Sequence, residues 1–275
     1  VETFRRGFFC QDLSLQMEYQ KETLLNKIHM TILVIALPAA LILVVEMFRG
    51  IFPATKNYPN TNSSKPQQQY AFLGVKIPGF ISECYRLIGL YVFGLSLTLI
   101  VAEFTKRRVG RLRPYFIDLC EPEFDDQQTC DDDLFAARYV EEYKCRQPIT
   151  GDQLLALQHS FPSDYAATSA YAMFFVIYYM QARITADWLR LVKIIAQLAS
   201  LFLAFVVACE RVASFHHHWT DVVAGSLLGV CMASFVMLTV AKLFSSVKVK
   251  RRPLKEDRIY GVFGLTTLPR IKYRK

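Results

Sequence analysis

The stretch Ile28–Phe48 reads IHMTILVIALPAALILVVEMF, an almost unbroken apolar run that Pro38 interrupts and that carries Glu46 near its end. About 20 consecutive apolar residues are enough to cross a bilayer as a helix. A helix of a soluble bundle would carry a polar stripe along one face, and such a stripe is largely missing here. The run therefore predicts a membrane-spanning helix.

Further apolar runs of similar length follow along the chain, at about Leu87–Phe104, Tyr165–Met180, Leu191–Cys209 and Val222–Leu243. The chain as a whole is 53% hydrophobic over 275 residues. These features predict an all-α integral membrane protein, a helical bundle with five spans. We expect residues 1–275 to form a single transmembrane domain.

The charge pattern sets the expected orientation. The chain has a formal net charge of +8, and Lys and Arg crowd the tail 244–275. The positive-inside rule makes this tail cytoplasmic, close to anionic membrane lipids. Five spans then place the segment 1–27 and the acidic loop 115–160 on the extracellular or lumenal side of the plasma membrane or an endomembrane. The positive charge lies at membrane flanks rather than on an aromatic-rich soluble patch, so we do not expect nucleic acid as a partner.

Four cysteines fall in segments that this topology places outside: Cys10, Cys120, Cys130 and Cys145. An oxidising compartment permits two disulfides among them, and their spacing leaves the pairing open.

The stretch Arg211–Asp221 reads RVASFHHHWTD and carries candidate catalytic side chains. His217 and Asp221 are four residues apart, the spacing that stacks two side chains on one helix face. The carboxylate can then orient the imidazole as a base or nucleophile, while Arg211 offers a planar fork for phosphate. Adjacent helical residues point about 100° apart, so the three histidines cannot hold one metal ion together. We expect neither a metal nor a cofactor.

Two other elements add anion-binding groups at the same predicted face. Lys106 and Arg113 are seven residues apart, two helical turns, so we expect them to share one face of a helix that Pro114 ends near Arg113. Ser163 precedes an apolar run and is a typical N-cap, and the free N–H groups of such a helix start attract anions. Together the three elements predict a phosphate pocket at the membrane surface. A transport pathway is less favoured, because the charges gather at one face instead of following a route through the spans.

The signatures in this chain resemble those of a known family, the lipid phosphate phosphatases, which are the membrane-embedded type-2 phosphatidate phosphatases. The matching motifs are Lys106-x6-Arg113-Pro114, Phe161-Pro162-Ser163 and Arg211-x5-His217-x3-Asp221. The stretches RGFFC (6–10), GRLRP (110–114) and HHWTD (217–221) resemble the animal branch.

This resemblance implies a fold with six spans, the first of which would precede Val1. It also implies that His217 forms a phosphohistidine and that Asp221 orients it. The phosphate would be held without metal by Lys106, Arg113, Ser163 and Arg211. The implied substrates are phosphatidate, lysophosphatidate, sphingosine 1-phosphate and ceramide 1-phosphate, presented from the outer or lumenal leaflet.

The chain departs from the family pattern at three positions. The family has Ser-Gly-His where this chain has Ser163, Asp164 and Tyr165, and the missing histidine is the general acid. Loss of such a group typically lowers the rate by on the order of 10²–10⁴. Glu210 replaces a serine beside Arg211, and carboxylates near a phosphate oppose its binding.

Two hypotheses follow from these departures. In the first, the protein is a weakened phosphatase in which Asp164, Glu210, Tyr165 or His159 supplies the proton. In the second, it is a catalytically silent relative that binds lipid phosphates or partner proteins. Both stay open on the sequence, as does homo-oligomerisation.

Overall fold

The structure is a computed structural model that describes residues 6–20, 26–51, 71–72, 75–76, 78–124, 129–130 and 138–241. The predicted cytoplasmic tail 244–275 and residues 125–128 and 131–137 of the acidic loop lie outside the described residues.

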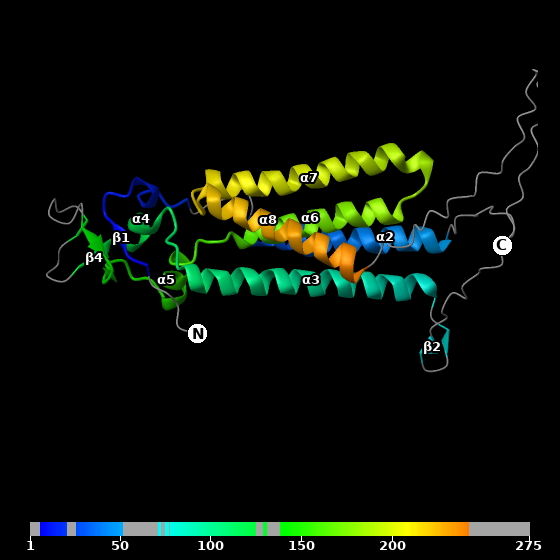
Figure 1. Cartoon of the computed structure of the whole chain (residues 1–275), viewed down its shortest axis with the longest axis horizontal. Helices are drawn as coiled ribbons and strands as arrows, with labels where there is room; N and C mark the ends of the chain where they lie inside the picture. Colours follow the sequence, from blue (N-terminus) through cyan, green and yellow to red (C-terminus); the bar gives the residue numbers. More distant parts are fainter. Residues whose placement is uncertain are drawn as a thin grey trace, which may run out of the picture.

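Long helices run side by side and form the body of the molecule (Figure 1). The first is built from α1 (Lys27–Thr31), a π-helical segment η2 (Ile32–Ala36) and α2 (Leu37–Ile51). The others are α3 (Gly79–Val109), α6 (Asp164–Arg183), α7 (Arg190–Ala213), which follows a short 3-10 turn η3 (Asp187–Leu189), and α8 (Trp219–Phe235), which continues into the π-helical segment η4 (Val236–Val240).

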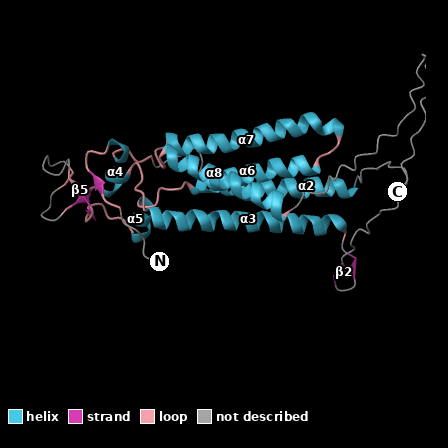
Figure 2. Ribbon diagram, viewed as in Figure 1, coloured by secondary structure: helices cyan, strands magenta, loops and turns pink. Residues whose placement is uncertain are grey.

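A small cap of short elements covers one end of the bundle, which we call the capped end (Figure 2). Its elements are β1 (Phe8–Phe9), η1 (Leu13–Leu15), α4 (Phe116–Cys120), β4 (Pro122–Glu123), β5 (Tyr139–Val140), β6 (Lys144–Cys145) and α5 (Gly151–Leu157). Strand β1 pairs antiparallel with β5, and β4 pairs antiparallel with β6. A two-stranded hairpin of β2 (Ala71–Phe72) and β3 (Val75–Lys76) lies near the opposite end.

Two disulfides and an aromatic cluster hold the cap together. Cys10 is bonded to Cys130, and Cys120 to Cys145. The four cysteines predicted to pair therefore do so, in a pattern that spacing alone left open. The rings of Phe8, Phe116 and Tyr143 meet edge to face with centroids 5.1–5.5 Å apart.

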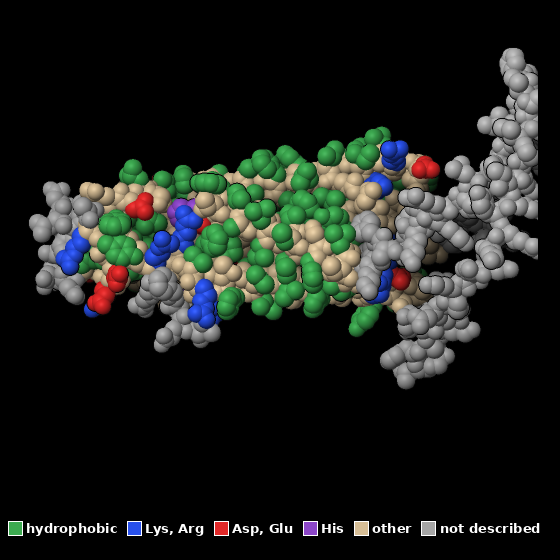
Figure 3. Space-filling model, in the orientation of Figure 1, with side chains coloured by type: hydrophobic (Ala, Val, Ile, Leu, Met, Phe, Trp, Pro, Cys, Tyr) green, Lys and Arg blue, Asp and Glu red, His purple; other side chains and the backbone are tan. Residues whose placement is uncertain are grey.

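The sides of the bundle are apolar. On the face seen in Figure 3, hydrophobic side chains cover the middle of the molecule, while charged side chains gather towards its two ends and His is seen towards one of them. Large hydrophobic residues of α7 are exposed, among them Leu191, Leu198, Phe202 and Phe205. Such surface is stable against lipid rather than water. The prediction of an all-α integral membrane protein is confirmed.

Four helical stretches are long and apolar enough to cross a membrane, by length and composition: Ile28–Ile51, Gly79–Val109, Asp187–Ala213 and Trp219–Val240. The remaining predicted span, Tyr165–Met180, falls within α6, which differs from the others in that most of its residues are buried inside the bundle. The count of five spans stays a prediction.

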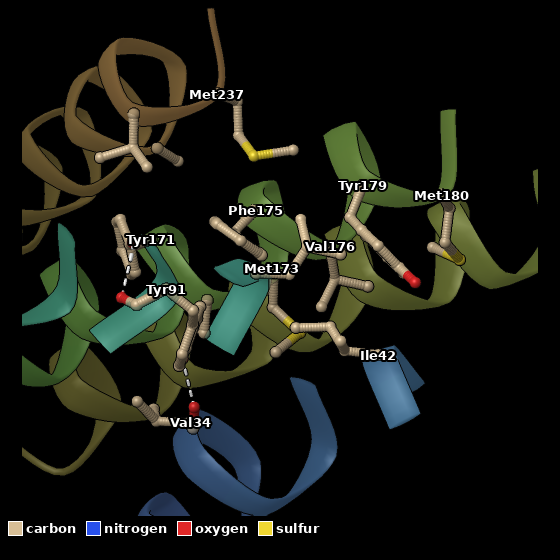
Figure 4. Packing of buried hydrophobic residues seen from close by; sticks show 14 of the residues in the cluster. Val34, Ile42, Tyr91, Tyr171, Met173, Phe175, Val176, Tyr179, Met180 and Met237 are labelled. Atoms are coloured by element: carbon tan, nitrogen blue, oxygen red, sulfur yellow. Dashed lines mark hydrogen bonds between the residues drawn. The ribbon is translucent and has the colours of Figure 1, made fainter. Parts of the chain in front are cut away.

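Buried polar groups in the core find partners across helices, as a lipid environment requires. Pro38 has no N–H to offer the carbonyl four residues earlier, at Val34. The Tyr91 hydroxyl donates to that carbonyl, and the Tyr171 hydroxyl donates to the Tyr91 carbonyl at 2.9 Å (Figure 4). These bonds join the first helix, α3 and α6.

Candidate active site

Four segments of the chain meet at the capped end: the last turn of α3, residues 110–113, residues 158–164 before α6, and the connection from α7 to α8. Helix α3 ends at Val109 because Gly110 takes the left-handed conformation, with φ 57°, and caps the helix. The sequence predicted a helix as far as Arg113, with Lys106 and Arg113 on one face. That prediction is wrong, because the glycine stops the helix before Pro114 can.

Lys106 lies in the last turn of α3 and is buried, with 6% of its surface exposed. Its Nζ lies 2.6 Å from Oδ2 of Asp164. Arg113 lies beyond the helix, where its Nε donates to the Ala156 carbonyl at 2.7 Å and its Nη1 donates to the His216 carbonyl at 3.3 Å. Arg113 therefore ties the end of α5 to the histidine loop.

Ser163 is the N-cap of α6, as its sequence context predicted. Its hydroxyl accepts from the N–H of Ala166, and its own N–H donates to the Asp221 carbonyl at 3.0 Å. The start of α6 is thereby fixed to the start of α8. Ser163 is completely buried.

His217 lies in the loop before α8 and is held by a backbone group. Its Nδ1 lies 2.8 Å from the Ser160 carbonyl oxygen. A carbonyl only accepts hydrogen bonds, so Nδ1 must carry the hydrogen and Nε2 must carry the lone pair. Nε2 is buried and has no hydrogen-bond partner among the described residues. Burial, assisted by the positive charge of Arg113, lowers the pKa of His217 to about 3, so the imidazole is neutral.

Asp221 lies in the first turn of α8, which begins only at Trp219. The predicted helical stacking of His217 on Asp221 is therefore wrong, since His217 precedes the helix. The buried carboxylate instead accepts from Arg111 Nη1 at 2.5 Å and from Ser160 Oγ at 2.6 Å. His218 Nδ1 lies 3.2 Å from its Oδ2.

Ser160 and Arg111 are site residues that the sequence reasoning missed. Ser160 is completely buried and contacts Asp221 through its hydroxyl and His217 through its carbonyl. Its N–H donates to the Arg111 carbonyl at 2.8 Å. The sequence did offer a signal for Arg111, since this residue stands inside the GRLRP stretch. Nothing in the stretch distinguished Arg111 from the other basic residues beside the membrane.

The two carboxylates that depart from the family pattern each pair with a basic residue of the predicted pocket. Asp164 pairs with Lys106, and Glu210 Oε2 accepts from Arg211 Nε at 2.5 Å. The guanidinium carbon of Arg211 lies 4.5 Å from the centre of the Tyr165 ring. Oδ1 of Asp164 and Oε1 of Glu210 are buried without a hydrogen-bond partner among the described residues.

The three consecutive histidines have different partners. The rings of His216, His217 and His218 lie against Ser214, Ser160 and Asp221 respectively. The site thus presents, near Lys106 and Arg113, a buried imidazole nitrogen that has no hydrogen-bond partner in the described part of the chain.

The fold and the site together define the class of protein: an all-α integral membrane protein with buried basic groups and a neutral histidine at one end of its helical bundle. The PAP2 superfamily model matches residues 87–245, which include the three motifs that contain Lys106, Ser163 and His217. The chain therefore belongs to the PAP2 superfamily and is a member of its lipid phosphate phosphatases.

Curated relatives carry matching names. The chain is 33% identical to a "Putative phosphatidate phosphatase" of Drosophila melanogaster over 90% of this chain, and it spans 65% of that relative's length. It is 29% identical to "Phospholipid phosphatase 1" of Mus musculus, over 92% of this chain and 81% of the relative. It is 26% identical to mouse "Phospholipid phosphatase-related protein type 5", over 97% and 81%. No solved structure matches the chain.

Proposed function

We propose that the protein hydrolyses lipid phosphate monoesters, such as phosphatidate, lysophosphatidate and sphingosine 1-phosphate, through a phosphohistidine on His217. The observation that supports the proposal is the hydrogen bond from Nδ1 to the Ser160 carbonyl. It fixes the tautomer in which Nε2 keeps its lone pair, which is the form a nucleophile needs.

In the proposed reaction, Nε2 attacks phosphorus, the bond from phosphorus to the ester oxygen breaks, and the lipid alkoxide leaves. Water then attacks the phosphohistidine, which releases phosphate and restores neutral His217. Lys106, Arg113 and Arg211 stabilise the charge on the phosphate oxygens. Asp221 acts through Ser160, whose carbonyl orients the imidazole.

The leaving alkoxide needs a proton, and the family's acid position holds Tyr165. Asp164 and Glu210 are engaged by Lys106 and Arg211, and burial lowers the pKa of His159, so that this histidine is mostly neutral at neutral pH. We propose that water supplies the proton and that the hydroxide it leaves takes up the proton released when a second water attacks the phosphohistidine. We expect a rate lower by on the order of 10²–10⁴ than that of an enzyme with the histidine.

A second function is favoured by the ion pairs in the site. Lys106 and Arg211, two of the three basic residues that would hold the phosphate, already bind carboxylates of the protein itself. A protein that only binds lipid phosphates, without turnover, would have this arrangement as well.

Phosphate release from phosphatidate in detergent micelles separates the two functions. We expect slow turnover by the full chain, loss of turnover in His217→Ala, and no change in His29→Ala, which removes an exposed histidine of α1. The double variant Asp164→Gly with Tyr165→His restores the family motif and should raise turnover by at least 10²-fold. Absence of turnover in both the full chain and the double variant would exclude the phosphatase.

A further inference from the structure

Three consecutive basic residues in the last turn of α3, at the capped end, have different surroundings (Figure 1). Lys106 is buried and pairs with Asp164 in the site. Arg107 is exposed and pairs with Glu103 at 3.3 Å. Arg108 is exposed as well, and it has no ion-pair partner among the residues that the structure describes. The proposed reaction uses only the first of the three, so it gives Arg108 no role.

The guanidinium of Arg108 lies over an aromatic ring. Its central carbon is 5.5 Å from the centre of the Phe104 ring, and Phe104 is 59% exposed. Residues four positions apart are neighbours on one helix face, so the ring lies one turn further from the capped end than the charge. The face of an aromatic ring attracts a cation and holds the planar guanidinium in place. Arg108 is therefore a positioned charge on the surface of the bundle.

An apolar stripe continues from Phe104 towards the middle of α3. Ile100 and Phe93 precede Phe104 by four and eleven residues, spacings that keep the three side chains on one helix face. Ile100 is 63% exposed and Phe93 is 53% exposed. With a rise of about 1.5 Å per residue, the stripe is about 16 Å long. This length matches one leaflet of a bilayer whose hydrocarbon core is roughly 30 Å thick.

The stripe and the charge together suit an anionic lipid. Because the sides of the bundle face lipid, the stripe lies against acyl chains and Arg108 lies at the level of the headgroups. A guanidinium can bind two phosphate oxygens through parallel N–H groups. A zwitterionic headgroup brings an ammonium group together with its phosphate, and Arg108 repels that ammonium. The charge therefore favours a headgroup that is only anionic.

We propose that Arg108, Phe104, Ile100 and Phe93 form a binding site for one anionic phospholipid of the leaflet at the capped end. The phosphate of this lipid binds the guanidinium, and an acyl chain lies along the stripe. The site lies on the lipid-facing surface of α3 and is separate from the candidate active site. Its occupant is a component of the bilayer that is bound and not hydrolysed, so the proposal does not rest on the proposed phosphatase function.

A tryptophan placed on the stripe tests this site by fluorescence quenching. The reporter is Ile100→Trp with Trp188→Phe and Trp219→Phe, which removes the two tryptophans of the chain. It is reconstituted in mixtures of phosphatidylglycerol and phosphatidylcholine in which one of the two lipids carries brominated chains. Quenching by each brominated lipid gives the relative association constant at the stripe. We expect phosphatidylglycerol to bind about fivefold more strongly, the effect of one basic residue at the membrane surface.

Variants of the reporter identify the charge. Arg108→Gln should reduce the relative association constant to about one. Arg108→Lys keeps the charge and loses the planar fork, so it should keep part of the preference. The double variant Glu103→Gln with Arg107→Gln is the control, because it removes a pair whose charges cancel in the same region of α3. It should leave the preference unchanged.

A second reporter tests the place of the lipid. Phe205→Trp, in the same background, lies on exposed surface of α7 at a similar distance from the end of its helix, and it should show no preference. An arginine that only anchors the helix at the membrane surface would give equal binding of the two lipids at Ile100→Trp. That result, an unchanged preference in Arg108→Gln, or the same preference at Phe205→Trp would overturn the proposal.

Discussion

Ser160 links the two site residues that sequence spacing joined directly. Its hydroxyl binds the carboxylate of Asp221, and its carbonyl binds the imidazole of His217. The orienting effect of the carboxylate thus reaches the histidine through the backbone of a third residue. This arrangement makes Ser160 a positioning residue for the nucleophile.

Removal of the Ser160 hydroxyl should lower kcat with little change in KM. Ser160→Ala loses a hydrogen bond to a charged group, about 1.5–3 kcal/mol, so we expect kcat to fall by roughly 10- to 100-fold. Ser200→Ala is the control, because this buried hydroxyl donates within its own helix, to the Ala196 carbonyl, far from the site. Equal kcat in Ser160→Ala and the full chain would show that the backbone contact suffices without the hydroxyl.

Arg111 neutralises a carboxylate that is completely buried, since Asp221 has 0% of its side chain exposed. Truncation of one partner leaves the other charge without compensation. Arg111→Gln should therefore lower the free energy of unfolding by about 2 kcal/mol or more, measured as a fall in the melting temperature in detergent.

Arg107→Gln is the matched control for Arg111. Arg107 pairs with Glu103 at 3.3 Å on the same helix, and both side chains are half-exposed. Such pairs contribute roughly 0.3–0.5 kcal/mol. Similar shifts for the two variants would contradict a structural role of Arg111.

Helices α6 and α8 approach closely because glycines of α8 face the backbone of α6. A Cβ atom on Gly229 would lie 2.2 Å from the Ala167 carbonyl oxygen, and one on Gly225 would lie 2.3 Å from the Ser163 carbonyl oxygen. Small residues at helix contacts allow such approach in membrane proteins. The contact positions Ser163, and with it Asp164, against the histidine loop.

Gly229→Ala should push α8 away from α6. We expect a loss of roughly 2 kcal/mol in the free energy of unfolding, since the new methyl group meets backbone that cannot move aside. Gly89→Ala in α3 is the control, because a Cβ there has nothing within 4 Å. That variant should be neutral or more stable by up to about 1 kcal/mol, since alanine favours a helix. The melting temperatures of both variants check this, and equal effects would contradict the close contact.

The helices were predictable, but several of their ends were not. Four of the five apolar runs fall within helices of the structure, and the fifth, Val222–Leu243, is helical as far as Val240, because burial of apolar side chains in lipid dominates their free energy. The ends at Val109 and Trp219 depend on Gly110 and on the hydrogen bonds around His218. Those local contacts decide whether two residues four or seven positions apart lie on one helix face. The sequence therefore identified the right site residues but placed each pair wrongly on a single helix face; the pairs are His217 with Asp221 and Lys106 with Arg113.

The whole bundle is held by ion pairs at both ends. At the end opposite the cap, Glu46 is buried, accepts from the Tyr179 hydroxyl at 3.0 Å and lies 3.3 Å from Arg183 Nε. Arg183 also binds Glu83 of α3 at 2.6 Å. These contacts join α2, α3 and α6. In the sequence Glu46 was only a charge near the end of an apolar run, because its partners Tyr179 and Arg183 are more than 100 residues away.

Buried histidines at the capped end make the stability of the whole molecule depend on pH. Burial lowers the pKa of His217 from 6.5 to about 3, with Arg113 in the same direction and Asp164 opposing. Below pH 6.5 the unfolded chain binds a proton at this histidine that the folded chain does not bind. The contribution of His217 to stability is therefore complete above pH 6.5 and decreases as the pH falls towards 3, by at most about 1.4 kcal/mol per pH unit.

Melting temperatures between pH 7.5 and 5 test this dependence. The full chain should lose more stability over this range than His217→Gln, which has no group to protonate at that position. His159 and His216 also have pKa values lowered by burial, and they are present in both proteins. The difference between the two curves therefore isolates His217. Parallel curves would mean that the imidazole takes up its proton in the folded protein as readily as in the unfolded chain, which would contradict a neutral nucleophile held in a buried site.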